Sequence, residues 1–145
     1  MSFQEDLNIG ESIELKVLME INQKYPNAYK VQGYFKDYDI YIPEIDKSVE
    51  VKLDLMSLET GNIVVEISYG GIPSALLTTK ADFWVFVTPN KCIWTTPKRI
   101  KKSIGMYKKD PARFKGRGDD KYKLAWLIPI KFIEETSLII KPFSP

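Results

Sequence analysis

The stretch that decides the fold is the pair of short apolar runs YDIYI at positions 38–42 and VEVKL at positions 49–53, joined by PEID at positions 43–46. Both runs alternate as β-strands do, and the proline and acids between them are typical of a turn. With a period of two, Glu50 and Lys52 share one face of the second strand, and its aliphatic residues share the other. In an antiparallel hairpin, Asp39 then lies nearly opposite Glu50.

Two carboxylates and a lysine therefore converge on one face of this hairpin. Carboxylate oxygens bind hard divalent cations, and a lysine two residues from one of them can contact the same ligand. Asp37 shares the strand parity of Asp39 and is a substitute candidate, although it lies further from Glu50 in the hairpin register. The alternative is an ordinary solvated strand face that carries a glutamate and a lysine.

Composition restricts the chemistry open to the chain. Its 145 residues, 44% hydrophobic and 28% charged, are typical of a single globular domain spanning residues 1–145. The absence of histidine excludes Ser-His-Asp and Cys-His mechanisms, a histidine-ligated zinc and nucleases of the His-Asn-His type. A catalytic base must therefore be a lysine, a carboxylate or a water activated by a metal.

The sequence also predicts where the protein works. The single cysteine, Cys92, has apolar neighbours, so we expect it to pack in the core of a protein from a reducing compartment. No run has the length of a membrane-spanning helix, and the N-terminus lacks the character of a signal peptide. We therefore expect a cytoplasmic protein without a membrane partner.

Residues 7–24 are expected to form an amphipathic helix that ends before Pro26. At 100° per residue, the inner stripe of this helix contains the aliphatic residues Ile9, Ile13, Leu15, Val17, Leu18, Met19 and Ile21. Glu11 and Glu14 fall on the same stripe, and a buried carboxylate needs a partner, which a cation would supply. A pairing of the acid with a lysine at the helix edge is the alternative.

A further acid follows on the next expected strand, residues 63–67. The aliphatic residues of this strand share one face, and Glu66 lies on the other. Paired antiparallel with residues 49–53, this strand would put Glu66 beside Glu50 or Lys52. Several acids around one lysine repel each other unless a cation is present, so this clustering favours a metal site over a structural ion pair.

The sequence Asp39, ten residues, then Glu50-Val51-Lys52 resembles the active-site motif of the PD-(D/E)XK nuclease superfamily, with Tyr38 in place of the proline. A longer string is similar to small nucleases of bacteriophages and other mobile elements: EVKLD at 50–54, TGNIVVE at 60–66 and GIPSALLTTKADFW at 71–84. The resemblance covers roughly residues 6–95. It implies a restriction-endonuclease-like fold: an α/β (α+β) domain whose central mixed β-sheet is flanked by helices. The core would span about residues 7–95, and a basic helix, a loop and a closing strand would occupy about residues 97–145.

The resemblance also implies roles for the hairpin residues. Asp39 and Glu50 would hold Mg²⁺, for which Mn²⁺ substitutes, with the Val51 carbonyl as a further oxygen ligand. Lys52 would orient or help to deprotonate the attacking water and stabilise charge on the scissile phosphate.

Two further acids receive roles in the same way. Glu14 matches the glutamate that the superfamily places near the metal on its first helix, so we prefer it to Glu11. Glu14 and Glu66 would hold a second metal ion or metal-bound waters. The residues alone do not decide between one metal ion and two.

The basic residues of the chain are concentrated near its C-terminal end. Residues 98–123 contain eleven basic and three acidic residues, although the whole chain has a net charge of only +2. We expect a helix after the Thr96-Pro97 cap and a basic loop over residues 111–121. A solvated helix and loop would account for this charge. So would a phosphate-binding surface, whose candidate DNA contacts are Lys101, Lys102, Arg113, Lys115 and Arg117.

These features together predict a divalent-metal-dependent endonuclease that hydrolyses phosphodiester bonds of DNA. The branch that the chain resembles implies a structure-specific enzyme, similar to Holliday-junction resolvases, that acts on branched or distorted duplexes. Two symmetric cuts would require a homodimer. A phage-encoded enzyme of this kind would work in the host cytoplasm. The alternatives are a non-catalytic nucleic-acid-binding protein that has kept the fold and a protein-interaction module.

Overall fold

The computed structural model describes residues 3–33, 36–116 and 118–144. The helices are α1 (Phe3–Asn22), α2 (Ser57–Thr60), α3 (Pro97–Tyr107) and α4 (Ile130–Thr136), and the 3-10 turns are η1 (Pro43–Ile45) and η2 (Ala75–Leu77). The strands are β1 (Tyr29–Lys30), β2 (Ile40–Ile42), β3 (Lys47–Leu53), β4 (Asn62–Tyr69), β5 (Ile72–Pro73), β6 (Phe83–Val87), β7 (Lys91–Thr95), β8 (Ala112–Phe114), β9 (Lys123–Pro129) and β10 (Ile139–Pro142).

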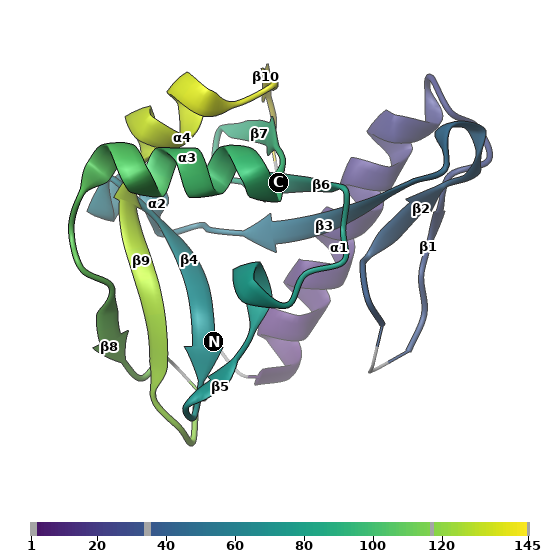
Figure 1. Cartoon of the computed structure of the whole chain (residues 1–145). Coiled ribbons are helices and arrows are strands. Elements are labelled where there is room, and N and C mark those ends of the chain that lie inside the picture. Colours follow the sequence, from purple (N-terminus) through teal and green to yellow (C-terminus); the bar gives the residue numbers. More distant parts are fainter. Residues whose placement is uncertain (1–2, 34–35, 117, 145) are drawn as a thin grey trace.

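The expected mixed α/β architecture is confirmed, and its strands form two sheets. The central sheet has six strands in the order β1-β2-β3-β6-β7-β10, with β3 and β6 parallel and the other neighbours antiparallel. The second sheet has four antiparallel strands in the order β5-β4-β9-β8. In Figure 1, β4 and β9 run across the direction of β3.

The hairpin predicted from residues 38–53 forms with the expected register. Ile40 lies opposite Val49, and η1 supplies the connection between the two strands. The backbone N–H of Asp39 donates a 3.0 Å hydrogen bond to the Val49 carbonyl, which extends the pairing beyond β2. Because side chains alternate, the register places Asp39 and Glu50 side by side on one face.

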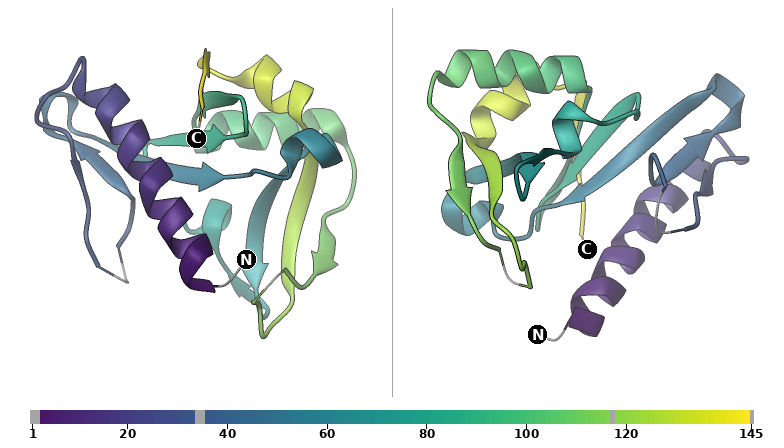
Figure 2. Two further views of the ribbon diagram at one scale, coloured as in Figure 1. Left: turned by 180° about the vertical axis from the view of Figure 1, so that it is seen from behind. Right: turned by 60° about the horizontal axis from the view of Figure 1, so that its bottom comes forward.

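Helix α1 covers the opposite face of the six-stranded sheet (Figure 2). Ile13, Val17 and Ile21 are buried against β2, β3 and β6, as the apolar spacing predicts. The prediction that Leu15 and Met19 belong to the inner stripe is wrong, because Leu15 is 51% exposed and Met19 is 62% exposed. A helix that covers one face of a sheet buries a narrow stripe, and these two residues lie outside it.

Strand β4 does not pair with β3, so the prediction that residues 63–67 extend the hairpin is wrong. Its partners are β5 and β9, with Val65 opposite Trp126. The short helix α2 separates β3 from β4 in the chain and redirects it into the second sheet (Figure 1). The neighbour of β3 in the central sheet is instead β6, with Glu50 opposite Trp84.

A second core fills the space between the two sheets. Trp84 and Phe86 on β6 are buried against Ile63 and Val65 on β4, and α3 and α4 add Ile100 and Ile133. Helix α3 begins as predicted, because the Thr96 hydroxyl accepts a hydrogen bond from the Arg99 N–H and Pro97 occupies the first turn. This core separates the basic C-terminal elements from α1.

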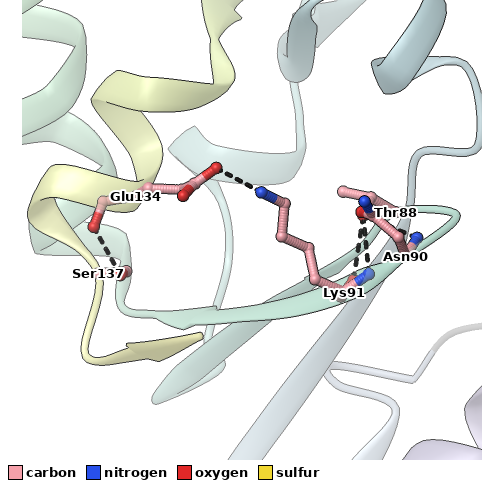
Figure 3. A network of polar contacts seen from close by, with 5 residues as sticks. All are labelled: Thr88, Asn90, Lys91, Glu134 and Ser137. Carbon is pink, nitrogen blue, oxygen red and sulfur yellow. Dashed lines mark hydrogen bonds and ion pairs between the residues drawn. The ribbon is translucent and has the colours of Figure 1, made fainter. Parts of the chain in front are cut away.

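Polar contacts join the β6–β7 turn to α4 (Figure 3). The buried Thr88 hydroxyl accepts a 3.1 Å hydrogen bond from the Lys91 N–H and lies 3.1 Å from the Asn90 Oδ1. The Lys91 ammonium lies 2.7 Å from the Glu134 carboxylate, and the Ser137 hydroxyl donates to the Glu134 carbonyl at the end of α4. These contacts join the β6–β7 turn of the central sheet to α4 without involving the acidic face of β3.

The C-terminal part contains more strand than the sequence predicts. Residues 112–114, which lie in the expected basic loop, form β8 along the free edge of β9. The alternation of Ala112, Arg113 and Phe114 is too short to identify a strand without its partner. Within the described ranges, none of the helices has both the length and the apolar character needed to cross a membrane.

Candidate active site

A cavity of about 390 Å³ opens between β3 and the second sheet. Its polar lining comes from separate elements: Lys36 and Asp37 precede β2, Glu50 and Lys52 lie on β3, and Glu66 lies on β4. Ala75, Thr78 and Thr79, in and after η2, complete the wall. Three of the residues predicted from the sequence, Glu50, Lys52 and Glu66, therefore meet at one cavity, although Glu66 reaches it from another sheet.

Glu50, which lines this cavity, is hydrogen-bonded to the buried carboxyl group of Asp39, which is not one of the lining residues. Burial and then the hydrogen bond to Asp39 raise the pKa of Glu50 to about 8. Burial also acts to raise the pKa of Asp39, but hydrogen bonds from Glu50, from the Val51 N–H and from Lys36 leave it below its ordinary value. Below about pH 8 these shifts favour a neutral Glu50 beside a charged Asp39 carboxylate.

Backbone geometry fixes Asp39 in this position. Its Oδ2 accepts a 2.7 Å hydrogen bond from the Val51 N–H, and its side chain is buried. This contact uses the N–H of Val51, whose carbonyl was the predicted metal ligand. A short side chain tied to the neighbouring strand has little rotational freedom, so the carboxyl pair is preorganised.

Lysines neutralise the remaining acids near the pair. The Lys36 ammonium lies 3.0 Å from Asp39 Oδ1 and 3.9 Å from Glu14 Oε1, and the Lys30 ammonium lies 3.0 Å from Glu14 Oε2. Burial and the Asp39 charge raise the pKa of Glu14, although both lysines oppose that rise. Of the two helix acids, Glu14 reaches the cluster, whereas Glu11 is exposed.

Lys52 is held by an aromatic ring. Its ammonium lies 5.2 Å from the centre of the Trp84 ring, which is opposite Glu50 on the paired strand β6. The indole N–H of Trp84 donates a 3.0 Å hydrogen bond to the Thr79 hydroxyl, so the buried ring has a fixed orientation. This cation–π contact directs the lysine into the cavity beside Glu50.

Glu66 forms the opposite wall and has its own partners. Its Oε2 accepts a 2.6 Å hydrogen bond from the Ser74 hydroxyl, and its Oε1 lies 3.6 Å from the Lys123 ammonium. The substitute candidate Asp37 also lines the cavity, but its carboxylate is largely exposed and pairs with Lys80 at 3.6 Å.

The chemistry of this donor set fits one hard divalent cation. Asp39 and Glu50 offer only oxygen, and the proton retained on Glu50 marks a place where added positive charge would be stabilised. Within the described ranges, no three acidic or cysteine side chains form a ready-made metal cage. Magnesium is commonly held by one or two carboxylates, with water and substrate phosphate completing its shell, so the pair suffices for one ion.

The predicted DNA-binding residues occupy two separate places. Lys101 and Lys102 are exposed on α3, which lies at one end of β4 and β9, whereas Arg113 and Lys115 are exposed along the edge formed by β8 (Figure 1). Arg117, the fifth candidate, lies outside the residues that the structure describes.

The sequence did not reveal three residues that shape the site: Lys36, Trp84 and Thr79. Lys36 precedes β2 in irregular backbone, where strand parity carries no information about direction. Trp84 lies in an almost entirely apolar run, which indicated only a buried strand. Its partner strand had to be known before the contact with Lys52 could be inferred.

The raised pKa of Glu50 predicts a pH-dependent stability in the absence of metal. A carboxyl group with a folded-state pKa above its unfolded value stabilises the protein below pH 4.5 and loses that contribution as the pH rises to about 8. The stabilising contribution of Asp39, whose pKa is lowered, is lost only below pH 3.8. It is therefore constant between pH 4.5 and pH 8. The free energy of unfolding, measured by urea titration in EDTA, should therefore fall by more than about 1 kcal/mol between pH 5 and pH 8.5.

The matched variants for this measurement are Glu50→Gln and Glu11→Gln. Glutamine keeps the size of Glu50 without a titrating proton, so Glu50→Gln should flatten the pH profile and raise stability at pH 8.5. Glu11→Gln, on the exposed face of α1, should retain the wild-type slope. A wild-type slope in Glu50→Gln would contradict this assignment of the proton.

No protein-family model, curated protein or solved structure matches this chain.

Proposed function

We propose that this protein is a divalent-metal-dependent endonuclease that hydrolyses phosphodiester bonds of DNA, as the resemblance to the PD-(D/E)XK superfamily implies. The observation that carries the proposal is the preorganised Asp39–Glu50 carboxyl pair with Lys52 beside it at one cavity. A carboxyl pair next to a lysine suits phosphodiester hydrolysis because the reaction needs a cation site and a positive group near the attacked phosphorus.

Asp39, Glu50 and Lys52 each have a distinct part in this proposed mechanism. Asp39 and Glu50 would hold Mg²⁺ or Mn²⁺, which supplies charge neutralisation at the phosphate and a more acidic water. To hold the ion, Glu50 would have to be in its charged form, so metal binding would be favoured as the pH approaches the raised pKa of about 8. Lys52, held over Trp84, would orient the attacking water and stabilise the charge that develops on the phosphate oxygens.

The substrate and the oligomeric state of the enzyme are part of the proposal. We propose a branched or distorted duplex as the substrate and the cytoplasm as the place of action. A branched junction has two equivalent strands to cut, so a homodimer would supply the second site. The exposed basic residues of α3 and β8 support a nucleic-acid partner because they neutralise phosphates.

A cleavage assay tests the proposal. Branched, flapped, linear duplex and single-stranded DNA are incubated with the purified protein in Mg²⁺, in Mn²⁺ and in EDTA. We expect cleavage in either metal, none in EDTA, and the fastest cleavage of a branched substrate. Salt-sensitive binding without cleavage of any substrate would contradict the catalytic proposal and favour a non-catalytic DNA-binding protein on the same fold.

A further inference from the structure

A second cavity, of about 590 Å³, lies outside the candidate active site, between the β4–β5 turn and the β8–β9 edge. Its walls include Gly70 and Gly71 from the turn, Arg113 from β8, and Lys121, Tyr122 and Lys123 at the start of β9. We call this cavity the basic pocket. It is separate from the residues assigned to catalysis.

The charge in the basic pocket is only partly offset by acids among the described residues: Lys123 is ion-paired, and Lys121 attracts the neighbouring Asp120 carboxylate. Neither Arg113 nor Lys121 forms an ion pair with any described residue, whereas Lys123 pairs with Asp119 at 3.2 Å and with Glu66 at 3.6 Å. Unpaired cations that converge on one hollow repel each other, so an anion bound there would be stabilised.

The guanidinium of Arg113 is held in place before any ligand arrives. Its central carbon lies 4.1 Å from the centre of the Tyr122 ring, and the Lys115 ammonium lies 5.0 Å from the same centre. Stacking on an aromatic ring reduces the freedom of the arginine side chain while its N–H groups stay available. A planar guanidinium with fixed orientation suits two oxygens of one phosphate.

The Gly70–Gly71 turn forms the wall of the basic pocket opposite Arg113, and this wall has no side chains. Gly70 and Gly71 have φ angles of +58° and +81°, which side chains rarely allow. A Cβ added at Gly70 would lie 2.6 Å from the Cδ of Lys121, so any larger residue would displace the Lys121 side chain. The Gly70 N–H donates a 2.7 Å hydrogen bond to the Tyr122 carbonyl, which fixes the turn against β9.

The basic pocket and the candidate active site share one strand and one ion pair. Lys123 lines the basic pocket, and its partner Glu66 lines the catalytic cavity. Glu66 lies on β4 and Gly70 directly follows the last residue of that strand, so the two cavities are neighbours along β4.

We propose that the basic pocket binds a backbone phosphate of the DNA strand a few nucleotides from the bond that is cut, through Arg113 and Lys121. This inference rests on the proposed nuclease function and adds a phosphodiester subsite to it. The pocket would fix the register of the strand so that the scissile phosphate enters the cavity at Glu50 and Lys52.

A binding experiment tests the subsite without any cleavage. Labelled duplex and single-stranded DNA are titrated with protein in EDTA at 50 to 200 mM salt, and fluorescence anisotropy gives the affinity. The test variant is Arg113→Gln/Lys121→Gln, which keeps the side-chain stems. The control is Lys16→Gln/Lys47→Gln, which removes the same charge from exposed positions outside both cavities.

The test variant should bind DNA about tenfold more weakly than the control, and its salt slope should be smaller by about one to two phosphate contacts. Arg113→Lys should lose less affinity, because it keeps the charge and loses only the planar guanidinium. Equal affinity and equal slope in test and control would overturn the proposal. So would inorganic phosphate that binds the wild type in the pocket without weakening DNA binding at constant ionic strength, since the pocket would then be a site for free anions only.

The two proposals fail in different ways. If the wild type cuts DNA and the test variant binds and cuts like the control, the subsite is wrong and the nuclease stands. If the wild type cuts no DNA but the test variant loses binding, the pocket remains a phosphate site and the nuclease is wrong. Circular dichroism and the urea midpoint of both double variants establish that the differences do not arise from unfolding.

Discussion

Glu50→Gln is expected to lose metal-dependent DNA cleavage by a factor of about 10³ or more. The substitution keeps the volume of the side chain and its place beside Asp39, but it removes the negative charge that a divalent cation needs. Single-turnover cleavage of the preferred substrate in Mg²⁺ measures the loss. DNA binding in EDTA should stay within about twofold of the wild type, because no phosphate contact has been removed.

The control for this variant is Glu11→Gln, which removes an acid from the exposed face of α1. It should cut DNA at the wild-type rate. A second readout separates loss of the site from loss of the fold: Ca²⁺ should raise the unfolding midpoint of the wild type but not that of Glu50→Gln. Cleavage by Glu50→Gln within tenfold of the control would remove Glu50 from the proposed mechanism.

Lys52→Met is expected to lower the rate of cleavage by about 10²-fold or more while metal binding stays close to that of the wild type. Methionine retains an unbranched stem that can lie over the Trp84 ring, so the main change is the loss of the ammonium. The effect should fall on kcat more than on KM, because the charge near Lys52 grows as the phosphorus is attacked.

Lys47→Met is the matched control, since Lys47 is exposed at the start of the same strand and lies outside the cavity. Its rate should equal that of the wild type. Lys52→Arg should recover part of the activity, because a positive charge returns with a different shape. Equal rates in Lys52→Met and Lys47→Met would show that Lys52 has no part in the chemistry.

The local parts of the site were predictable from the sequence, and the non-local parts were not. The Asp39–Glu50 pair follows from alternation and a short turn, both of which act over neighbouring residues. The choice of Glu14 over Glu11 followed from the resemblance, and the structure places Glu14 near Asp39 through Lys36.

Which of the two sheets contains Glu66 depends on residues far from it in the chain. The alternation of residues 63–67 fits either β3 or β9 as a partner, and only the packing of Ile63 and Val65 against β6 selects the second sheet. The position of Lys36 was equally beyond local rules, because a lysine in irregular backbone can point in any direction. Such choices are made by tertiary packing, which a single sequence does not display.

The two walls of the cavity at the candidate active site are each held together by paired strands. The paired strands are close in the chain for one wall and distant for the other, and this has a consequence for folding during synthesis. The hairpin with Asp39 and Glu50 closes over ten intervening residues, whereas β4, which carries Glu66, is held in place by β9, where Val65 meets Trp126. Pairing between distant segments forms late, because more chain entropy is lost before contacts compensate. In a nascent chain, the Asp39–Glu50 pair would therefore form well before the wall that contains Glu66 is in place to complete the proposed DNA-binding cavity. For the proposed nuclease, cleavage would then begin only after the last third of the protein has left the ribosome.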